Sequence, residues 1–310
     1  LYLKHPRRWP VLGERAAFDC LTRQDVLDYH ASRYVPNNVV LSIAGDVDAA
    51  EILSHLELLV EDLKSRPLNR EPIPHEPHQF GSRRVRKEFA VPYSKLHLAW
   101  RLPCSAHPDT PALSALSSIL GGGRSARFYE KFHDRLGLVY SIEVHSNQSE
   151  TDEGAFTISM DVDRAQRDKV RDLVLQELRN LAEEDFTEDL KRVCKQTRVS
   201  RLRRRSSASG VASEMGADWF GSRNLNLSSE WQEAIERVTT EDLHRVCSTW
   251  LSSPNVTEVS LDPPGSNAGD EEMASASAGT FLSEHVLGNG MKVVILSLIH
   301  ISEPTRRRGI

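Results

Sequence analysis

One passage occurs twice in this 310-residue chain, and the repeat restricts the folds that the chain can adopt. Residues 21–43 and residues 238–261 both contain a threonine, an aspartate three residues later, and then a Pro-Asn pair. In each copy the Thr and Asp predict the capped start of a short helix, the Pro-Asn pair predicts its end, and the apolar run that follows predicts a buried strand. The matched residues are Thr22 with Thr239, Asp25 with Asp242, Val26 with Leu243, and Tyr34 with Leu251.

The two copies lie 217 residues apart, which is the size of a domain and far longer than a solenoid repeat. The repeat therefore predicts two related domains in tandem. About 159 residues lie between position 80 and Thr239, whereas about 21 precede Thr22, so equal domain lengths would place roughly 140 further residues upstream. We expect the first domain to be truncated.

Two linkers divide the chain. Four prolines fall between Arg66 and Gly81, and residues 262–280 have no apolar face. After the second linker, Asn289-Gly290 between two β runs predicts a hairpin. The expected division is residues 1–66 for the end of the first domain, 67–80 for a linker, 81–262 for a complete second domain, 263–280 for a linker, 281–296 for the start of a third domain, and 297–310 for an extraneous tail similar to translated sequencing adapter.

The order of elements predicts an α+β fold. In the first segment we expect a helix at 22–33, a strand at 39–45 and a helix at 49–64. In the second domain we expect strands at 85–90 and 95–101, a hairpin of 139–145 with 154–162, and several helices. These elements predict an antiparallel or mixed sheet packed with helices in an α/β sandwich.

Composition excludes several classes of function. The chain is 39% hydrophobic, 27% charged and carries a net charge of −5, which gives no general reason to bind nucleic acid or an acidic membrane surface. Its apolar stretches are strand-sized, so we expect no membrane span. The four cysteines form no CxxC pair, which leaves free thiols or two distant disulfides open. The cellular compartment stays open.

Four passages carry a family resemblance, at residues 5–13, 21–48, 120–142 and 287–296. They resemble the pitrilysin/insulinase family of zinc metallopeptidases, which includes the mitochondrial processing peptidases. The resemblance implies tandem metallopeptidase-like domains, which occur in pairs and number four in the larger members. It implies a four-domain parent, of which this chain holds the end of domain one, all of domain two and the start of domain three.

The family's zinc ligands are an HxxEH helix and a more distant Glu. No two of the 12 histidines are four residues apart, and His75 and His78 are separated by Pro77, which disfavours a regular helix. The resemblance places the zinc ligands upstream, and the equivalent helix of domain two, LSALSSILGG, has no His or acidic residue. We therefore expect zinc to be a cofactor of the parent protein, with no catalytic or metal-binding residue in this chain.

The resemblance also suggests two substrate-binding residues. In the substrate-contacting half of such enzymes, a Tyr follows an Arg by seven positions and both contact the substrate backbone. Tyr140 matches the Tyr, but His133 stands at the Arg position. The alternative is that Tyr140 packs at a strand start with a local hydroxyl partner.

Gly121–Gly123 could form a sharp turn, hold an anion or touch peptide. The basic run 191–205 predicts a solvated helix face or a wall of a peptide chamber, because adjoining acids argue against nucleic acid.

The leading interpretation is a fragment of a zinc metalloendopeptidase that provides the non-catalytic second domain and helps to enclose the peptide substrate. This fragment alone is expected to be inactive. The alternative is a structural or peptide-binding core subunit without peptidase activity, and a third possibility is a folding and dimerisation scaffold. The expected partners are a peptide or unfolded protein substrate and the other half of the same parent chain, with no nucleic acid and no membrane span.

Overall fold

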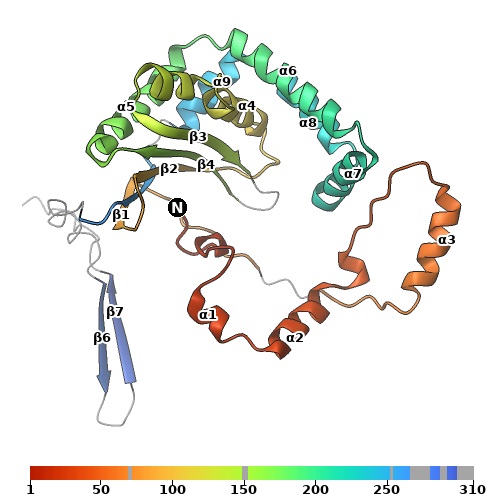
Figure 1. Ribbon diagram of the computed structural model, residues 1–310. Helices are drawn as coiled ribbons and strands as arrows, with labels where there is room; N and C mark the ends of the chain where they lie inside the picture. Colours follow the sequence, from red (N-terminus) through yellow and green to blue (C-terminus); the bar gives the residue numbers. More distant parts are fainter. Residues whose placement is uncertain (69–71, 149–152, 252–253, 266–279, 287–291, 299–310) are drawn as a thin grey trace, which may run out of the picture.

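The computed structural model describes residues 1–68, 72–148, 153–251, 254–265, 280–286 and 292–298. Its largest part is an α+β domain in which helices cover one face of a five-stranded sheet (Figure 1). The strand order is β1-β5-β2-β4-β3. β1 runs parallel to β5 and the other pairs are antiparallel, so the sheet is mixed, which is one of the two arrangements predicted. The strands are β1 (Arg83–Glu88), β2 (Ser94–Leu102), β3 (Val139–Asn147), β4 (Gly154–Val162) and β5 (Thr257–Asp262).

The domain contains several helices, as expected from the sequence. They are α4 (Thr110–Gly121), α5 (Arg167–Asn180), α6 (Thr187–Arg204), α7 (Ala208–Ser222), α8 (Leu227–Glu236) and α9 (Thr240–Val246), with π-helical turns at Tyr129–Arg135 and Cys247–Leu251. The sequence did not predict α7. It begins at a Ser207 side chain that accepts a hydrogen bond from Gly210 N, and the side chains that it buries are Glu214 and Asp218. A helix that buries acids shows no apolar stripe for sequence reasoning to detect.

The core lies between the sheet and α4. Alternate residues of β2 and β4 point into it, and Trp100 meets Phe156 edge-on with ring centroids 6.5 Å apart. α4 buries Leu113, Leu116 and Ile119 completely. Burial of each such side chain stabilises the fold by about 1.5–3 kcal/mol, so β2, β4 and α4 together form the centre of the domain.

Gly121 allows α4 to approach β3 closely. A Cβ atom at this position would lie 2.5 Å from Val144 N and 2.6 Å from Val144 Cβ. We expect Gly121→Ala to lower the free energy of unfolding by about 1–3 kcal/mol, because helix and strand must move apart. Gly81→Ala is the matched control, since nothing lies within 4 Å of its added Cβ. Urea unfolding followed by circular dichroism measures both, and equal midpoints would contradict the role of Gly121.

Both copies of the repeated passage form the same helix start. Thr22 and Asp25 make a reciprocal capping box at α2 (Arg23–Arg33), and Thr239 and Asp242 make one at α9. In each copy the aspartate backbone N lies 3.2 Å from the threonine Oγ1. The predicted helix starts are therefore confirmed at both positions.

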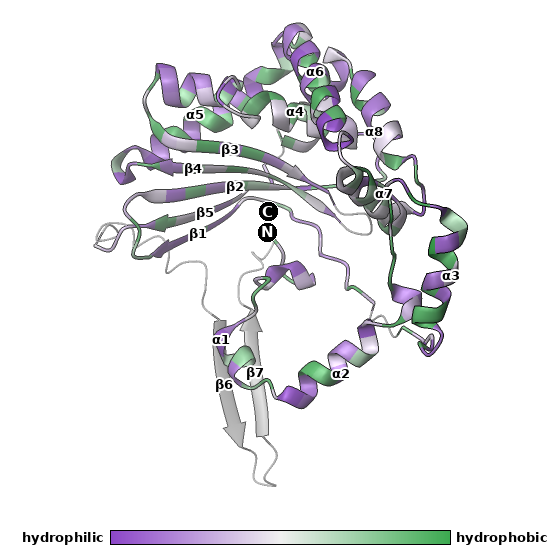
Figure 2. Ribbon diagram, turned by 45° about the vertical axis from the view of Figure 1, so that its right-hand side comes forward, coloured by the Kyte–Doolittle hydropathy of each residue, from purple (hydrophilic) through white to green (hydrophobic). Residues whose placement is uncertain are grey.

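The two copies differ in how far their matched side chains are buried. Leu243 and Leu251 of the second copy are 0% and 3% exposed, whereas the matched Val26 and Tyr34 are 58% and 66% exposed. α2 and α3 (Ala49–Val60) extend away from the sheet with apolar residues along them (Figure 2). Several side chains of α3 are accordingly exposed, namely Leu53, Leu58 and Leu59.

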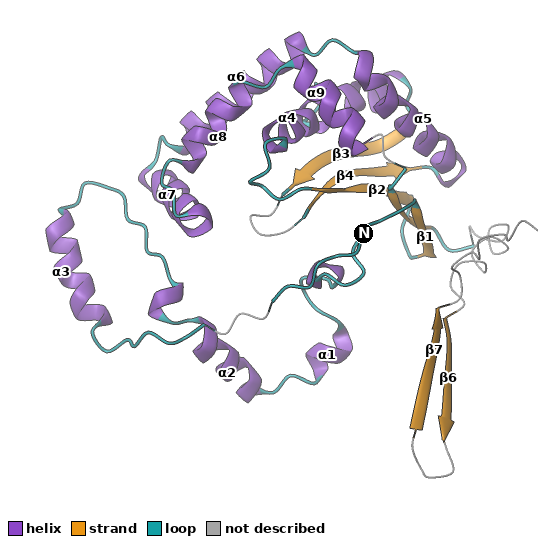
Figure 3. Ribbon diagram, turned by 180° about the vertical axis from the view of Figure 1, so that it is seen from behind, coloured by secondary structure: helices purple, strands orange, loops and turns teal. Residues whose placement is uncertain are grey.

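The predicted strand at 39–45 is wrong. These residues form a loop between α2 and α3 (Figure 3), although the matching residues of the second copy form β5. A strand requires a hydrogen-bonded neighbour, and none of the described strands pairs with residues 39–45, whereas β5 lies between β1 and β2. The predicted helix at 49–64 is shorter than expected, because α3 ends at Val60.

The remaining elements lie outside the five-stranded sheet. α1 (Arg15–Asp19) and single 3-10 turns at Pro6–Arg8 and Pro36–Asn38 belong to the first segment. β6 (Thr280–Val286) and β7 (Lys292–Leu298) pair antiparallel, so β7 extends two residues into the stretch expected to be a tail. The predicted Asn289-Gly290 turn lies outside the described residues, and a third domain stays a prediction.

Candidate functional site

α4 and α5 lie on one face of the sheet (Figure 1), and the β2 residues that alternate with its buried core residues include the polar Lys95, His97 and Arg101. Lys95 Nζ on β2 lies 2.9 Å from Asp161 Oδ1 on β4, and His97 Nδ1 lies 2.8 Å from Ser159 Oγ. These residues alternate with the buried core residues of the same strands, so they project from the other side of the sheet. We call this surface the open face, defined by Lys95, His97, Glu143, His145, Ser159 and Asp161.

His97 is held neutral on the open face. Desolvation at the sheet surface and the charge of Lys95 lower its pKa, and the charge of Asp161 opposes them only in part. A neutral imidazole can donate one hydrogen bond and accept another. His97 is not among the predicted site residues, although the period of two along residues 95–101 places it beside Lys95 on one face.

Tyr140 lies at one end of the sheet, next to a register shift between Val139 and Ser141. Its hydroxyl donates to Asp163 Oδ1 at 3.0 Å, and its ring tilts against Tyr93 with centroids 4.1 Å apart. This hydrogen bond raises the pKa of Tyr140, so the phenol stays protonated at neutral pH. Tyr140 therefore has the local partner of the alternative interpretation, and it remains 48% exposed.

His133 has a different set of partners in the π-helical turn before β3. Its ring stacks on Tyr129 with centroids 4.4 Å apart, and its Nδ1 lies 2.7 Å from Asp134 Oδ1. The guanidinium of Arg124 lies 6.0 Å from the centroid of the same Tyr129 ring, so Tyr129 contacts both His133 and a permanent cation. His133 and Tyr140 share no partner among these contacts, and a shared substrate-binding role for the two stays a prediction.

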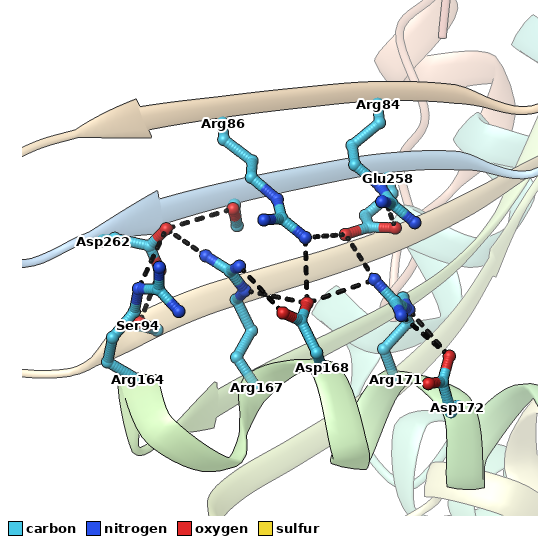
Figure 4. A network of polar contacts seen from close by, with 11 residues as sticks. Arg84, Arg86, Ser94, Arg164, Arg167, Asp168, Arg171, Asp172, Glu258 and Asp262 are labelled. Atoms are coloured by element: carbon cyan, nitrogen blue, oxygen red, sulfur yellow. Dashed lines mark hydrogen bonds and ion pairs between the residues drawn. The ribbon is translucent and has the colours of Figure 1, made fainter. Parts of the chain in front are cut away.

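A network of charges joins α5 to the sheet (Figure 4). Arg167 and Asp262 are both completely buried and form an ion pair, and Ser94 Oγ donates to Asp262 Oδ1 at 2.5 Å. Asp168 accepts from Arg86 at 2.9 Å and from Arg171 at 3.1 Å. The network has no signal in the sequence, because its members come from β1, β2, α5 and β5. Its contacts connect secondary-structure elements, so its role is structural.

The pKa of Asp168 shows how the network depends on charge. Desolvation favours the neutral acid, but the hydrogen bond from Arg167 and the charges of Arg167 and Arg86 outweigh it and lower the pKa below 3.8. A lowered folded-state pKa contributes stability that is present above the unfolded value. That stability is lost as pH falls from about 3.8 through the lower folded value.

The residues that the structure describes do not form a zinc site. Among the described residues, no group of three or more His, Cys, Asp or Glu side chains is placed to hold a metal ion. α4, the helix that the resemblance equates with the zinc-binding helix, carries only Thr, Pro, Ala, Leu, Ser, Ile and Gly, and most of it is buried. None of the four cysteines forms a disulfide in the described structure, and burial raises the pKa of Cys247 to about 12. No helix in the described ranges is long and apolar enough to cross a membrane.

Comparison with known proteins places these features in a family. Residues 21–196 match the family described as Peptidase M16 inactive domain. A zinc protease PqqE from Helicobacter pylori is 24% identical over 270 residues, covering 84% of this chain and 60% of that protein. The chain therefore spans about 60% of the length of this curated relative.

Two crystal structures have a similar fold. A protease from Helicobacter pylori gives a TM-score of 0.75 at 24% identity and covers 84% of this chain and 64% of that one. A peptidase M16 inactive domain from Pseudomonas fluorescens gives 0.73 at 21% identity and covers 85% and 63%. At these identities the likeness concerns the fold alone.

Proposed function

The chain belongs to the M16, or pitrilysin/insulinase, family of peptidases, and we propose that it provides the non-catalytic second domain of a longer zinc metalloendopeptidase. In this role residues 81–262 help to enclose a peptide substrate, and the zinc ligands come from outside this chain. The observation that carries the proposal is α4, whose side chains are apolar or small and pack into the core with no group for metal or proton chemistry.

The open face supports the enclosing role. It presents hydrogen-bonding groups of both kinds. Lys95 pairs with Asp161 across β2 and β4, and the next pair on this face is a neutral His97 opposite Ser159. A peptide backbone offers alternating donors and acceptors, which such a surface can satisfy without a fixed side-chain preference. The expected partners are accordingly a peptide and the remainder of the parent protein.

Zinc content and hydrolysis test this function. We expect the 310-residue chain to hold substoichiometric zinc and to cleave no peptide, because α4 supplies no ligand. A longer protein that contains this chain is expected to cleave peptides, to lose that activity to a chelator and to regain it with zinc. One tightly held zinc per chain, or hydrolysis by the 310-residue chain, would overturn the proposal. A longer protein that binds peptide and never cleaves it would favour the core-subunit alternative.

The substrate-binding role of His133 is tested by His133→Arg. If His133 and Tyr140 face the peptide, a permanent charge at 133 should strengthen a contact to substrate carbonyls and tighten binding by up to about 1–2 kcal/mol. Peptide titration of the longer protein measures the change. His55→Arg is the matched control, because His55 is exposed on α3 and lies outside the open face. If His133→Arg binds the peptide with unchanged affinity, His133 and Tyr140 do not form a shared substrate site.

A further inference from the structure

A cavity of about 830 Å³ lies among α4, α6, α7 and α8. None of the open-face residues lines it, so it is distinct from that surface. Its volume is within the range of sites that bind small molecules and short peptide segments. Its wall combines hydroxyl and amide groups with an apolar part that is formed by Val193, Leu227 and Trp231.

Two buried acceptors in the wall lack partners. Glu214 is 5% exposed, and its Oε1 accepts from Arg205 at 2.8 Å and from Arg201 at 3.2 Å, but its Oε2 has no hydrogen bond. Gln232 is 8% exposed, and its Oε1 also has no hydrogen bond. Gln232 Nε2 donates to Glu236 Oε1 at 2.7 Å, which fixes the direction of the amide. Buried acceptors are normally satisfied, so the cavity is suited to a ligand with N–H donors.

The charges of the cavity wall indicate which class of ligand it favours. Desolvation opposes ionisation of Glu214, but hydrogen bonds from Arg201 and Arg205 outweigh it and lower its pKa, so Glu214 is an anion between two cations. Arg204 also lines the cavity, is exposed, and has no ion-pair partner in the described part of the chain. The wall therefore carries more positive than negative charge, which favours a ligand that brings a carboxylate.

We propose that this cavity binds the C-terminal end of a peptide. Backbone N–H groups of the peptide donate to Glu214 Oε2 and Gln232 Oε1, its terminal carboxylate pairs with Arg204, and an apolar side chain packs on the Trp231 side of the wall. This proposal rests on the proposed function, because that function makes a peptide the expected ligand. Arg201 and Arg204 of the basic run on α6 are thereby part of a peptide-binding wall, whereas Arg203 lies outside it.

Calorimetric titration of the 310-residue chain tests the carboxylate contact. The probe is an N-acetylated hexapeptide of alanine and leucine with a free C-terminal carboxylate, and its C-terminal amide is the comparison. We expect saturable binding of one peptide per chain, about tenfold weaker for the amide because a charge-assisted contact is lost. Equal affinities, or no saturable binding of either peptide, would overturn the proposal.

Variants locate the contact. Arg204→Ala is expected to weaken binding of the free acid about tenfold and to leave the amide unchanged. Arg203→Ala is the matched control, one residue earlier on α6, exposed and outside the cavity wall, and it should bind both peptides as the wild type does. Thr197→Trp should fill the cavity and weaken both peptides, with circular dichroism to confirm folding. If Thr197→Trp does not fold, the Arg204 and Arg203 pair still decides the test.

The same titration separates this inference from the proposed function. If Tyr140→Ala weakens peptide binding and Arg204→Ala does not, the peptide binds elsewhere, so the cavity proposal fails while the enclosing role stands. Failure of the proposed function appears independently, as hydrolysis or stoichiometric zinc binding by the 310-residue chain.

Discussion

Asp262→Ala is expected to lower the free energy of unfolding by about 3–5 kcal/mol, because it leaves the buried Arg167 guanidinium without its main counter-charge. Both side chains are 0% exposed, and Asp262 also accepts hydrogen bonds from Ser94 and Ser260. Asp168 stays beside Arg167 at 3.2 Å, but its side chain is 48% exposed and already serves two other arginines. It cannot replace a buried carboxylate.

The matched control is Asp172→Ala. Asp172 is another network carboxylate, 2.9 Å from Arg171, but its side chain is 66% exposed. An exposed ion pair of this kind contributes about 0–1 kcal/mol. Chemical unfolding followed by circular dichroism compares the two variants. Similar losses in both would show that burial does not set the strength of the network.

A double replacement tests the physical cause. Changing Arg167→Met together with Asp262→Leu removes both buried charges and keeps apolar volume between α5 and β5. Such replacements are often neutral or stabilising, so the double variant should be more stable than Asp262→Ala alone. A further loss would mean that the geometry of the ion pair, rather than its charge balance, holds β5 to α5.

Features that depend on neighbours in sequence could be predicted. The capping boxes at Thr22 and Thr239 are closed by residues three positions away, and the alternation of 95–101 and 154–162 identifies β2 and β4. Both signals are local, because a cap and a pleat arise within a few residues. The mixed α+β sheet followed from the order of these elements.

Features that depend on distant residues could not be predicted. The Arg167–Asp262 pair spans 95 residues, and the unpartnered acceptors of Glu214 and Gln232 become apparent only when α7 and α8 surround a cavity. The prediction of a strand at 39–45 is wrong for a related reason. A strand needs a hydrogen-bonded neighbouring strand, and the local sequence does not show whether one is present. For the candidate site, sequence reasoning identified Tyr140 and His133 but neither Asp163 nor Tyr129 beside them.

The repeat provides the sharpest comparison of sequence with environment. Leu243→Ala is expected to destabilise the fold by about 2–5 kcal/mol, because Leu243 is completely buried and its loss leaves a cavity among packed neighbours. Val26→Ala, at the matched position of the first copy, is expected to change stability by less than about 0.5 kcal/mol because Val26 is 58% exposed. Urea unfolding of the two variants of the 310-residue chain, followed by circular dichroism, measures both effects.

The pair of variants also tests how the first copy behaves in solution. The two helix starts have the same capping box, so a difference between Leu243→Ala and Val26→Ala arises from packing and not from helix propensity. If Val26→Ala costs as much as Leu243→Ala, then α2 is buried in solution as its counterpart α9 is, and another surface covers Val26 and Tyr34. If only Leu243→Ala is costly, the stability of this chain comes from residues 81–262, and α2 stays exposed as the structure has it.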